Sequence, residues 1–174
     1  MPDIDVPLVS QGDDDVGCVP ACVKMVIEFY SAIYPDLPNP HMDALKKAMG
    51  YDDSGTSLDG VTGVNRILVG GAHRLEFDWR DFAVFDDIKG ELEGGRPVIA
   101  WMKPNRALEL SHSVVIKATT DDDLRVKVND PEPDDPKSEY TTSEFMKQWE
   151  NSDRILIRAK VTERPQQREL GDYA

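Results

Sequence analysis

Residues 18–34 are predicted to form a helix that is apolar around almost its whole circumference. The clear polar exceptions are Lys24 and Glu28, which stand four residues apart on one narrow face. Pro20 is tolerated only in the first turn of a helix, so the helix must begin close to Cys18. A helix that is apolar on nearly all sides is stable only when other elements surround it. The chain is therefore expected to fold around this central, buried helix.

The remaining pattern consists mainly of helices in the first half of the chain and strands in the second. Further helices are predicted at residues 38–50, about 58–68 and 81–95, and a short strand at residues 74–77. Later strands are predicted at residues 96–102, 111–118, 124–130 and 154–161. A short helix at residues 141–149 begins where Thr141 and Glu144 have the spacing of a capping box. This segregation predicts an α+β fold, with helices packed on a C-terminal antiparallel sheet.

One domain is expected over residues 1–174, with a polar tail, about residues 161–174, that frays. The chain carries 20 Lys and Arg against 33 Asp and Glu, a net charge of −13. Nucleic acid is disfavoured as a partner, because phosphate binding needs a basic surface. The sequence has neither an apolar run of membrane-spanning length nor the features of a secretory signal at its start. We therefore expect no membrane partner and a cytoplasmic location.

The two cysteines of the chain, Cys18 and Cys22, lie one turn apart where the apolar helix begins. A thiol at a helix N-terminus faces unpaired backbone N–H groups and the positive end of the helix dipole, and both favour the thiolate. Cys22 lies deeper in the helix, where cysteine usually fills the core. The spacing is poor for a disulfide, and no cluster of further ligands suggests a metal. Position alone leaves Cys18 open as core filler or as a nucleophile.

A histidine and an aspartate are predicted to meet on the sheet. Alternation along residues 111–118 places His112 on the apolar face of its strand. Along residues 124–130 it places Asp130 on the apolar face and Asn129 on the opposite, basic face, which we expect to be solvated. A hairpin turning at the run of three aspartates brings His112 and Asp130 roughly opposite one another. Such a pair either orients and charges a catalytic base or only fixes the sheet.

Gln11 adds a fourth group, because it precedes Cys18 by seven residues and can offer its side-chain amide near the thiol. Together these residues would supply an oxyanion donor, a nucleophile, a base and the residue that orients the base: Gln11, Cys18, His112 and Asp130. Each residue type is common, but this order along a chain is much less so. The combination favours a nucleophilic cysteine over core filler.

The order and spacing resemble those of papain-like cysteine peptidases, in particular the bacteriocin-processing (double-glycine leader) peptidases and their stand-alone relatives. Those proteins carry a glutamine and then Cys-Gly-x-Ala-Cys at the start of the central helix, and the matching stretch here is "CVPACVKMV", residues 18–26. Their later signature is a strand that begins with histidine and a strand that ends in Asp-Pro. The matching stretches are "HSVVIKA", residues 112–118, and "VKVNDP", residues 126–131.

The resemblance implies a papain-like fold and assigns a role to each candidate residue. Cys18 would be the nucleophile, and His112 the general base and then the general acid. Asp130 would orient the imidazole, and Gln11 with the backbone N–H of Cys18 would form the oxyanion hole. Val19 is a departure, because the family usually has glycine after the nucleophile.

The function predicted from the sequence is hydrolysis of a peptide or amide bond through a thioester on Cys18, with a peptide or protein as substrate. Neither a metal ion nor an organic cofactor is predicted. Two alternatives stay open. The same residues serve acyl transfer to an amine or a thiol instead of water. The other alternative is a catalytically silent domain that only binds peptide, and Val19 is the feature that keeps it open.

Overall fold

The computed structural model describes residues 3–108 and 111–165. The helices are α1 (Cys18–Ile33), α2 (Met42–Ala48), α3 (Leu58–Gly63), the 3-10 helix η1 (Val64–Ile67), α4 (Phe85–Glu93) and α5 (Thr142–Glu150). The strands are β1 (His73–Arg80), β2 (Val98–Met102), β3 (His112–Thr119), β4 (Arg125–Asn129), β5 (Glu139–Thr141) and β6 (Leu156–Glu163). Helices combined with an antiparallel sheet confirm the predicted α+β class.

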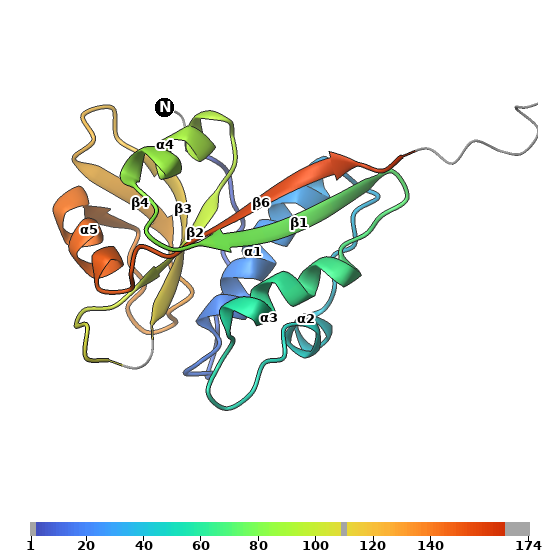
Figure 1. Ribbon diagram of the computed structural model, residues 1–174, viewed down its shortest axis with the longest axis horizontal. Coiled ribbons are helices and arrows are strands. Elements are labelled where there is room, and N and C mark those ends of the chain that lie inside the picture. The colour runs from blue at the N-terminus through green and yellow to red at the C-terminus, as the bar shows by residue number, and fades with distance from the viewer. Residues whose placement is uncertain (1–2, 109–110, 166–174) are drawn as a thin grey trace, which may run out of the picture.

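The described strands form one antiparallel sheet in the order β1-β6-β2-β3-β4-β5. Strand β6 pairs with β1 along its whole length, but it pairs with β2 only at Ile99 and Ala100. Figure 1 shows the result, in which β1 and β6 form a long ribbon on one side and β2, β3 and β4 lie on the other. The sheet therefore has two parts that join where β6 meets β2.

Helix α1 lies against the middle of the sheet, as its apolar circumference requires. Most of its residues are buried, and Met25 and Ile27 are fully buried. They belong to a core cluster that also takes in Phe77, Ile99 and Val115 from three strands. The predicted polar exceptions, Lys24 and Glu28, form an ion pair with 3.7 Å between charged atoms. The helix begins at Cys18, with Pro20 in its first turn.

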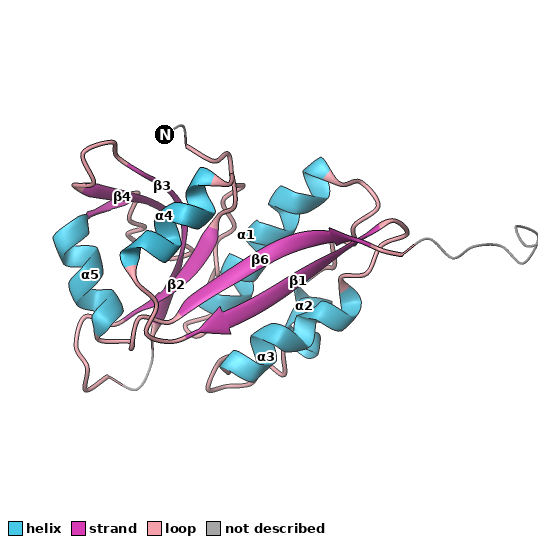
Figure 2. Cartoon of the chain, turned by 45° about the horizontal axis from the view of Figure 1, so that its top comes forward, coloured by secondary structure: helices cyan, strands magenta, loops and turns pink. Residues whose placement is uncertain are grey.

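The alternate side chains of β2, β3 and β4 form a second core cluster with α4 and α5. Figure 2 shows these two helices beside the same strands. Phe145 and Trp149 of α5 are completely buried there. Helix α5 begins with the predicted capping box, in which the Thr141 hydroxyl accepts the Glu144 N–H at 3.2 Å. The middle of the sheet is thus covered on both faces, and packing holds its strands in fixed positions.

Several element boundaries differ from the expectations, and strand β5 was not predicted. The helix expected over about 58–68 tightens to 3-10 geometry after Gly63, where the Asn65 side chain bonds both backbone groups of Phe77 and ties η1 to β1. Strand β6 runs through Glu163, because its last residues pair with the start of β1, so the expectation of a tail that frays from about 161 is wrong for residues 161–163. The rest of that tail, residues 166–174, lies outside the described residues.

Candidate active site

The thiol of Cys18 lies at the first residue of α1, and its side chain is 6% exposed. The N-cap residue is Gly17, so no side chain caps this end of the helix, and its first turn has no acidic residue. The first backbone N–H groups of a helix have no partner within the helix. Sγ of Cys18 lies 3.8 Å from the carbonyl oxygen of Ser111. The nucleophile candidate therefore sits where the start of α1 meets the residue before β3.

Next to this thiol, Nε2 of His112 lies 2.6 Å from Oδ1 of Asp130. The Asp130 side chain is almost completely buried, whereas about a third of the His112 side chain stays exposed. Asp130 also accepts the backbone N–H groups of Glu132 at 3.0 Å and Lys137 at 2.9 Å. Because Nε2 of His112 faces the carboxylate, Nδ1 is the ring nitrogen left for Cys18. Ser111, whose carbonyl oxygen is near Sγ of Cys18, directly precedes His112, so the thiol and the His–Asp pair are neighbours at the start of β3.

The charges and hydrogen bonds around His112 favour its protonated form. Burial by itself disfavours the imidazolium, but hydrogen bonds to Asp130 and to the Cys18 side chain outweigh it and raise the pKa of His112 to about 9. Burial also works against the carboxylate of Asp130, yet its bonds from His112 and from two backbone N–H groups lower its pKa. At neutral pH the pair is therefore an ionised carboxylate holding an imidazolium, the arrangement that stabilises a neighbouring thiolate.

Cys22, one turn further along α1, is completely buried. Burial, with the nearby Cys18 and Asp130 charges, raises the pKa of the Cys22 thiol. Its environment favours the neutral thiol, which is what a core residue needs. The two thiols of the chain therefore differ in exposure, because Cys18 at the start of α1 lines a cavity, whereas Cys22 lies wholly inside the core.

Gln11 is anchored by both its backbone and its side chain. Its backbone N–H donates to the carbonyl oxygen of Pro131, the residue after Asp130, at 2.9 Å. Its side-chain Nε2 donates to the carbonyl oxygen of Asp14 at 2.7 Å, and the same oxygen accepts the N–H of Gly17 at 3.1 Å. The amide nitrogen of Gln11 therefore lies beside the peptide that precedes Cys18, with one of its two N–H groups engaged.

The register of the β3–β4 hairpin places His112 and Asp130 near one another but not directly opposite. Val115 pairs with Asn129, so the ladder would continue with Asp130 opposite Val114 and not opposite His112. His112 and Asp130 are diagonal neighbours, and their side chains still meet because such neighbours are within reach of long side chains. The contact that the sequence predicted is present, and the two residues are offset by two positions along the hairpin.

The expectation that Asn129 faces solvent is also wrong. Asn129 is 7% exposed, and its Nδ2 donates to the carbonyl oxygen of Val6 at 2.7 Å. The segment before Gln11 covers this face of the sheet, where Ile4 also donates its backbone N–H to Lys117. That segment has no helical or strand pattern, so the sequence did not indicate that it would pack on β4. Asn129 is occupied with this contact, and Asp130 is the residue bound to His112.

A cavity of about 150 Å³ opens beside Cys18. Part of its lining comes from the start of α1 and the loop before it, and the rest from the α2–α3 loop, β2 and the residue before β3: Asp15, Val16, Cys18, Val19, residues 54–56, Trp101 and Ser111. Residues 54–56, Trp101 and Ser111 were not predicted from the sequence as site residues. Trp101 and Ser111 lay within predicted strands, and no motif marked residues 54–56, because only tertiary contact brings these residues to the thiol.

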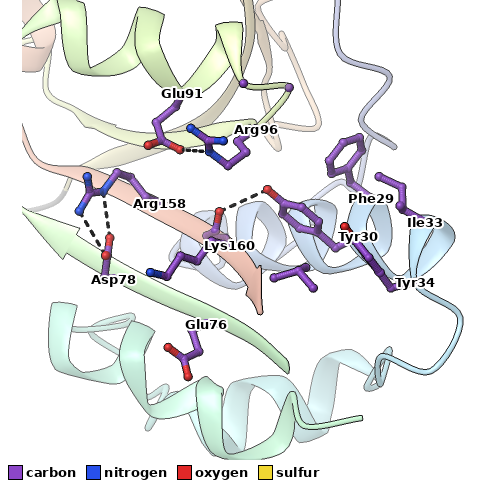
Figure 3. A pocket seen from close by; sticks show the side chains of 14 residues that line it. Phe29, Tyr30, Ile33, Tyr34, Glu76, Asp78, Glu91, Arg96, Arg158 and Lys160 are labelled. Atoms are coloured by element: carbon purple, nitrogen blue, oxygen red, sulfur yellow. Dashed lines mark hydrogen bonds and ion pairs between the residues drawn. The ribbon is translucent and has the colours of Figure 1, made fainter. Parts of the chain in front are cut away.

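A larger cavity, of about 660 Å³, lies elsewhere, between the second half of α1 and strands β1 and β6. Figure 3 shows Phe29 and Tyr30 on one side and several charged side chains around it. Arg96 pairs with Glu91 at 2.6 Å, and Arg158 pairs with Asp78. None of the four candidate catalytic residues lines this cavity. The volume of a cavity alone therefore does not identify the active site. The smaller cavity, which Cys18 lines, is the candidate active site.

Two kinds of feature, a metal-binding cluster and a membrane-spanning helix, are absent among the residues that the structure describes. No group of three or more His, Cys, Asp or Glu side chains in residues 3–108 and 111–165 is placed to hold a metal ion. Among the helices in those ranges, none has the length and apolar character needed to cross a membrane.

Comparison with known proteins supports the fold and the resemblance. The model of a family described as peptidase C39-like matches residues 3–156. The chain has no match among curated protein sequences. A crystal structure of a C39-like peptidase from Bacillus anthracis is similar, with a TM-score of 0.66 at 12% identity, over 94% of this chain and 100% of that one.

Two further similar structures are peptidase domains, one from an ABC transporter and one from a toxin secretion protein. The peptidase domain of Streptococcus ComA, described as a bi-functional ABC transporter in a quorum-sensing pathway, gives a TM-score of 0.63 at 19% identity, over 91% of this chain and 98% of that one. The N-terminal C39-like domain of the toxin secretion ATP-binding protein from Vibrio parahaemolyticus gives 0.53 at 12% identity, over 81% and 97%. At these identities the likeness establishes the papain-like fold of C39 peptidase domains.

Proposed function

Since this chain belongs to the peptidase C39-like family, we propose that it is a cysteine peptidase that hydrolyses peptide or amide bonds through a thioester on Cys18. The observation that carries the proposal is the position of His112, which bonds the Asp130 carboxylate at 2.6 Å and lies close enough to Cys18 for that side chain to raise its pKa. A buried His–Asp pair that only fixed the sheet would have no reason to contact a thiol at a helix N-terminus.

In the proposed reaction Cys18 starts as a thiolate beside the His112 imidazolium. Sγ attacks the carbonyl carbon, and the electron pair of the C=O bond moves onto the oxygen. The backbone N–H of Cys18 and the free N–H of the Gln11 amide hold this oxyanion. As the C–N bond breaks, Nδ1 of His112 gives its proton to the departing amine, and the thioester remains.

The second half of the reaction releases the acid. Neutral His112 takes a proton from water while the water oxygen attacks the thioester carbonyl. The S–C bond then breaks, the thiolate of Cys18 re-forms beside the imidazolium, and the carboxylic acid leaves. Asp130 keeps its charge throughout and holds the ring in the orientation that both proton transfers need.

We propose a peptide or protein as the substrate, with the carbonyl carbon entering the cavity of about 150 Å³ beside Cys18. Both cysteines of the protein are free thiols. A cysteine nucleophile works only while it is reduced. The activity therefore requires a reducing compartment, and the cytoplasm supplies one.

The test is digestion of a peptide mixture of diverse sequence, with cleavage sites read by mass spectrometry. We expect cleavage by the wild-type chain and none by Cys18→Ala, whereas Cys22→Ala, which removes the buried thiol, keeps cleavage. In water enriched in ¹⁸O, hydrolysis places the label in the new carboxyl group. Products that join the acyl group to an added amine would assign acyl transfer instead. Peptide binding without either product would assign a silent binding domain.

A further inference from the structure

The loop between Gln11 and Cys18 is organised around a residue outside the proposed catalytic set, Asp14. Its carbonyl oxygen accepts Nε2 of Gln11 at 2.7 Å and the N–H of Gly17 at 3.1 Å. Its own N–H donates back to the carbonyl oxygen of Gln11 at 3.4 Å. One residue thus binds the glutamine side chain on one side and the peptide before Cys18 on the other.

The carboxylate of Asp14 ties this loop to the segment that contains α2. Oδ2 accepts the Tyr51 hydroxyl and the Nζ of Lys46, the latter at 2.8 Å, while Oδ1 accepts the N–H of Val16 at 3.2 Å. Nζ of Lys46 also lies 4.7 Å from the centre of the Tyr51 ring. The three side chains therefore form one partly buried cluster, which we call the Asp14 cluster: Asp14, Lys46 and Tyr51.

The protonation states suit these bonds at neutral pH. Burial works against the carboxylate of Asp14, but the hydrogen bonds from Lys46 and Tyr51 outweigh it and lower the pKa of Asp14. Burial and the bond to Asp14 raise the pKa of Tyr51 to about 12, so the phenol keeps its proton and donates it. The Asp14 cluster is thus an ionised carboxylate held by two donors.

The cluster also fits closely against the start of α1. A Cβ atom on Gly17 would come within 2.8 Å of Oδ2 of Asp14, so a larger residue before Cys18 would push the carboxylate away from its partners. The charge of Cys18 is near enough to contribute to the pKa of Tyr51. The Asp14 cluster therefore lies against Gly17, the residue before Cys18, whose N–H belongs to the proposed oxyanion hole.

We propose that Asp14, held in place by Lys46 and Tyr51, is a positioning residue for the oxyanion hole. A glutamine side chain with three rotatable bonds loses much of its value as an oxyanion donor unless it is fixed before the reaction. The Asp14 carbonyl takes one N–H of the Gln11 amide and so directs the other toward the oxyanion. Tyr51 and Lys46 prevent the Asp14 loop from moving when substrate enters. The inference rests on the proposed function, since it needs Cys18 to form a tetrahedral adduct.

Two reactions of Cys18 separate this role from a purely structural one. Acylation by p-nitrophenyl acetate passes through a tetrahedral oxyanion, whereas alkylation by iodoacetamide does not. Neither reaction requires knowledge of the natural substrate, and Cys18→Ala gives the background rate of each. The variants are Tyr51→Phe, which keeps the ring under Lys46, together with Lys46→Met and Asp14→Ala. Lys89→Met is the matched control, because Nζ of Lys89 also lies 2.8 Å from a carboxylate, that of Asp123, away from the site.

We expect Tyr51→Phe and Lys46→Met to slow acylation by roughly tenfold, less than loss of a whole oxyanion donor would. Alkylation should stay at the wild-type rate, and Lys89→Met should change neither. In a Gln11→Ala background, Tyr51→Phe should cause little further loss, because the two changes act through the same donor. Asp14→Ala should lose the most acylation if it folds, which its circular dichroism spectrum reports.

Other outcomes overturn the proposal in distinguishable ways. A parallel fall of acylation and alkylation in Tyr51→Phe would mean that the cluster supports the thiol or the fold. Unchanged acylation, or losses that multiply with the loss from Gln11→Ala, would mean that the cluster does not act through Gln11. If the wild-type chain is acylated no faster than Cys18→Ala, the proposed function itself fails and this role fails with it.

Discussion

Oδ1 of Asp130 lies 2.6 Å from Nε2 of His112, and the same carboxylate accepts backbone N–H groups from Glu132 and Lys137. Asp130 follows the last residue of β4, so its position is set by its own loop as well as by the sheet. A carboxylate that is bound from several sides cannot turn away from the imidazole. The orientation of the His112 ring is therefore fixed by Asp130 before any substrate arrives.

The first prediction compares the two adjacent residues at the end of β4. Asp130→Ala removes the partner that charges and orients His112, so we expect turnover to fall by roughly a thousandfold and alkylation of Cys18 at neutral pH to slow. Asn129→Ala leaves the buried carbonyl of Val6 without its donor, so we expect a loss of about 1–2 kcal/mol in the free energy of unfolding but most of the turnover to remain. Turnover, alkylation rates and denaturant titrations on both variants check this.

The contrast between the two variants makes this prediction specific. If Asn129→Ala abolished turnover while its free energy of unfolding stayed at the wild-type value, the amide and not the carboxylate would act on His112. If Asp130→Ala kept full turnover, the contact of 2.6 Å would serve only the sheet.

A second prediction concerns the two thiols. Cys18 lines the cavity at the start of α1, whereas Cys22 is completely buried and its pKa is raised by that burial. We expect iodoacetamide at neutral pH to label Cys18 in the folded protein well before Cys22, and both at similar rates in denaturant. Peptide mapping of a time course measures this. Equal labelling of the two thiols in the folded protein would contradict the assignment of the nucleophile.

The features that the sequence could predict are those set by local pattern. The apolar circumference of α1 required burial on all sides, and α1 does pack both against the sheet and against α2. Alternation along β3 and β4 predicted the contact between His112 and Asp130, because both strands have one strongly apolar face. The capping box at Thr141 depended on two residues three positions apart, and it formed at the expected place.

The features that it could not predict depend on contacts between distant segments. The burial of Asn129 comes from Val6, which lies in a stretch without helix or strand pattern. The register of the hairpin shifts at an irregularity between Ile116 and Ala118, which no turn residue announces. The Asp14 cluster likewise joins a loop to α2 across more than thirty positions, and single charges in a chain this acidic give no hint of their partners.

A third prediction concerns Gln11. Gln11→Ala removes the amide that is expected to hold the oxyanion, so turnover should fall by on the order of a hundredfold. The side chain makes one hydrogen bond, to the Asp14 carbonyl, so the free energy of unfolding should fall by only about 1 kcal/mol. Alkylation of Cys18 should keep its wild-type rate. A variant that loses folding, or one that keeps full turnover, would make Gln11 a loop residue without a catalytic role.

The fourth prediction follows from the pKa of His112, which rises from 6.5 to about 9 in the folded protein. A raised pKa means that the fold binds the proton more tightly than the unfolded chain does. The stability that His112 contributes is therefore fully present below pH 6.5 and is lost as the pH rises toward 9. His112→Gln should accordingly differ most from the wild type below pH 6.5, and the difference in free energy of unfolding should shrink between these two values.

Turnover should depend on the same proton of His112. The imidazolium donates to the leaving amine, so turnover should fall on the alkaline side with a midpoint near the pKa of about 9. Asp130→Asn removes the charge that favours the imidazolium, so this midpoint should move to lower pH, while Lys89→Met, which alters a distant ion pair, should leave it in place. Turnover measured from neutral pH to about pH 10 in all three proteins gives the midpoints. An alkaline midpoint that Asp130→Asn leaves unchanged would show that a group other than His112 supplies the proton.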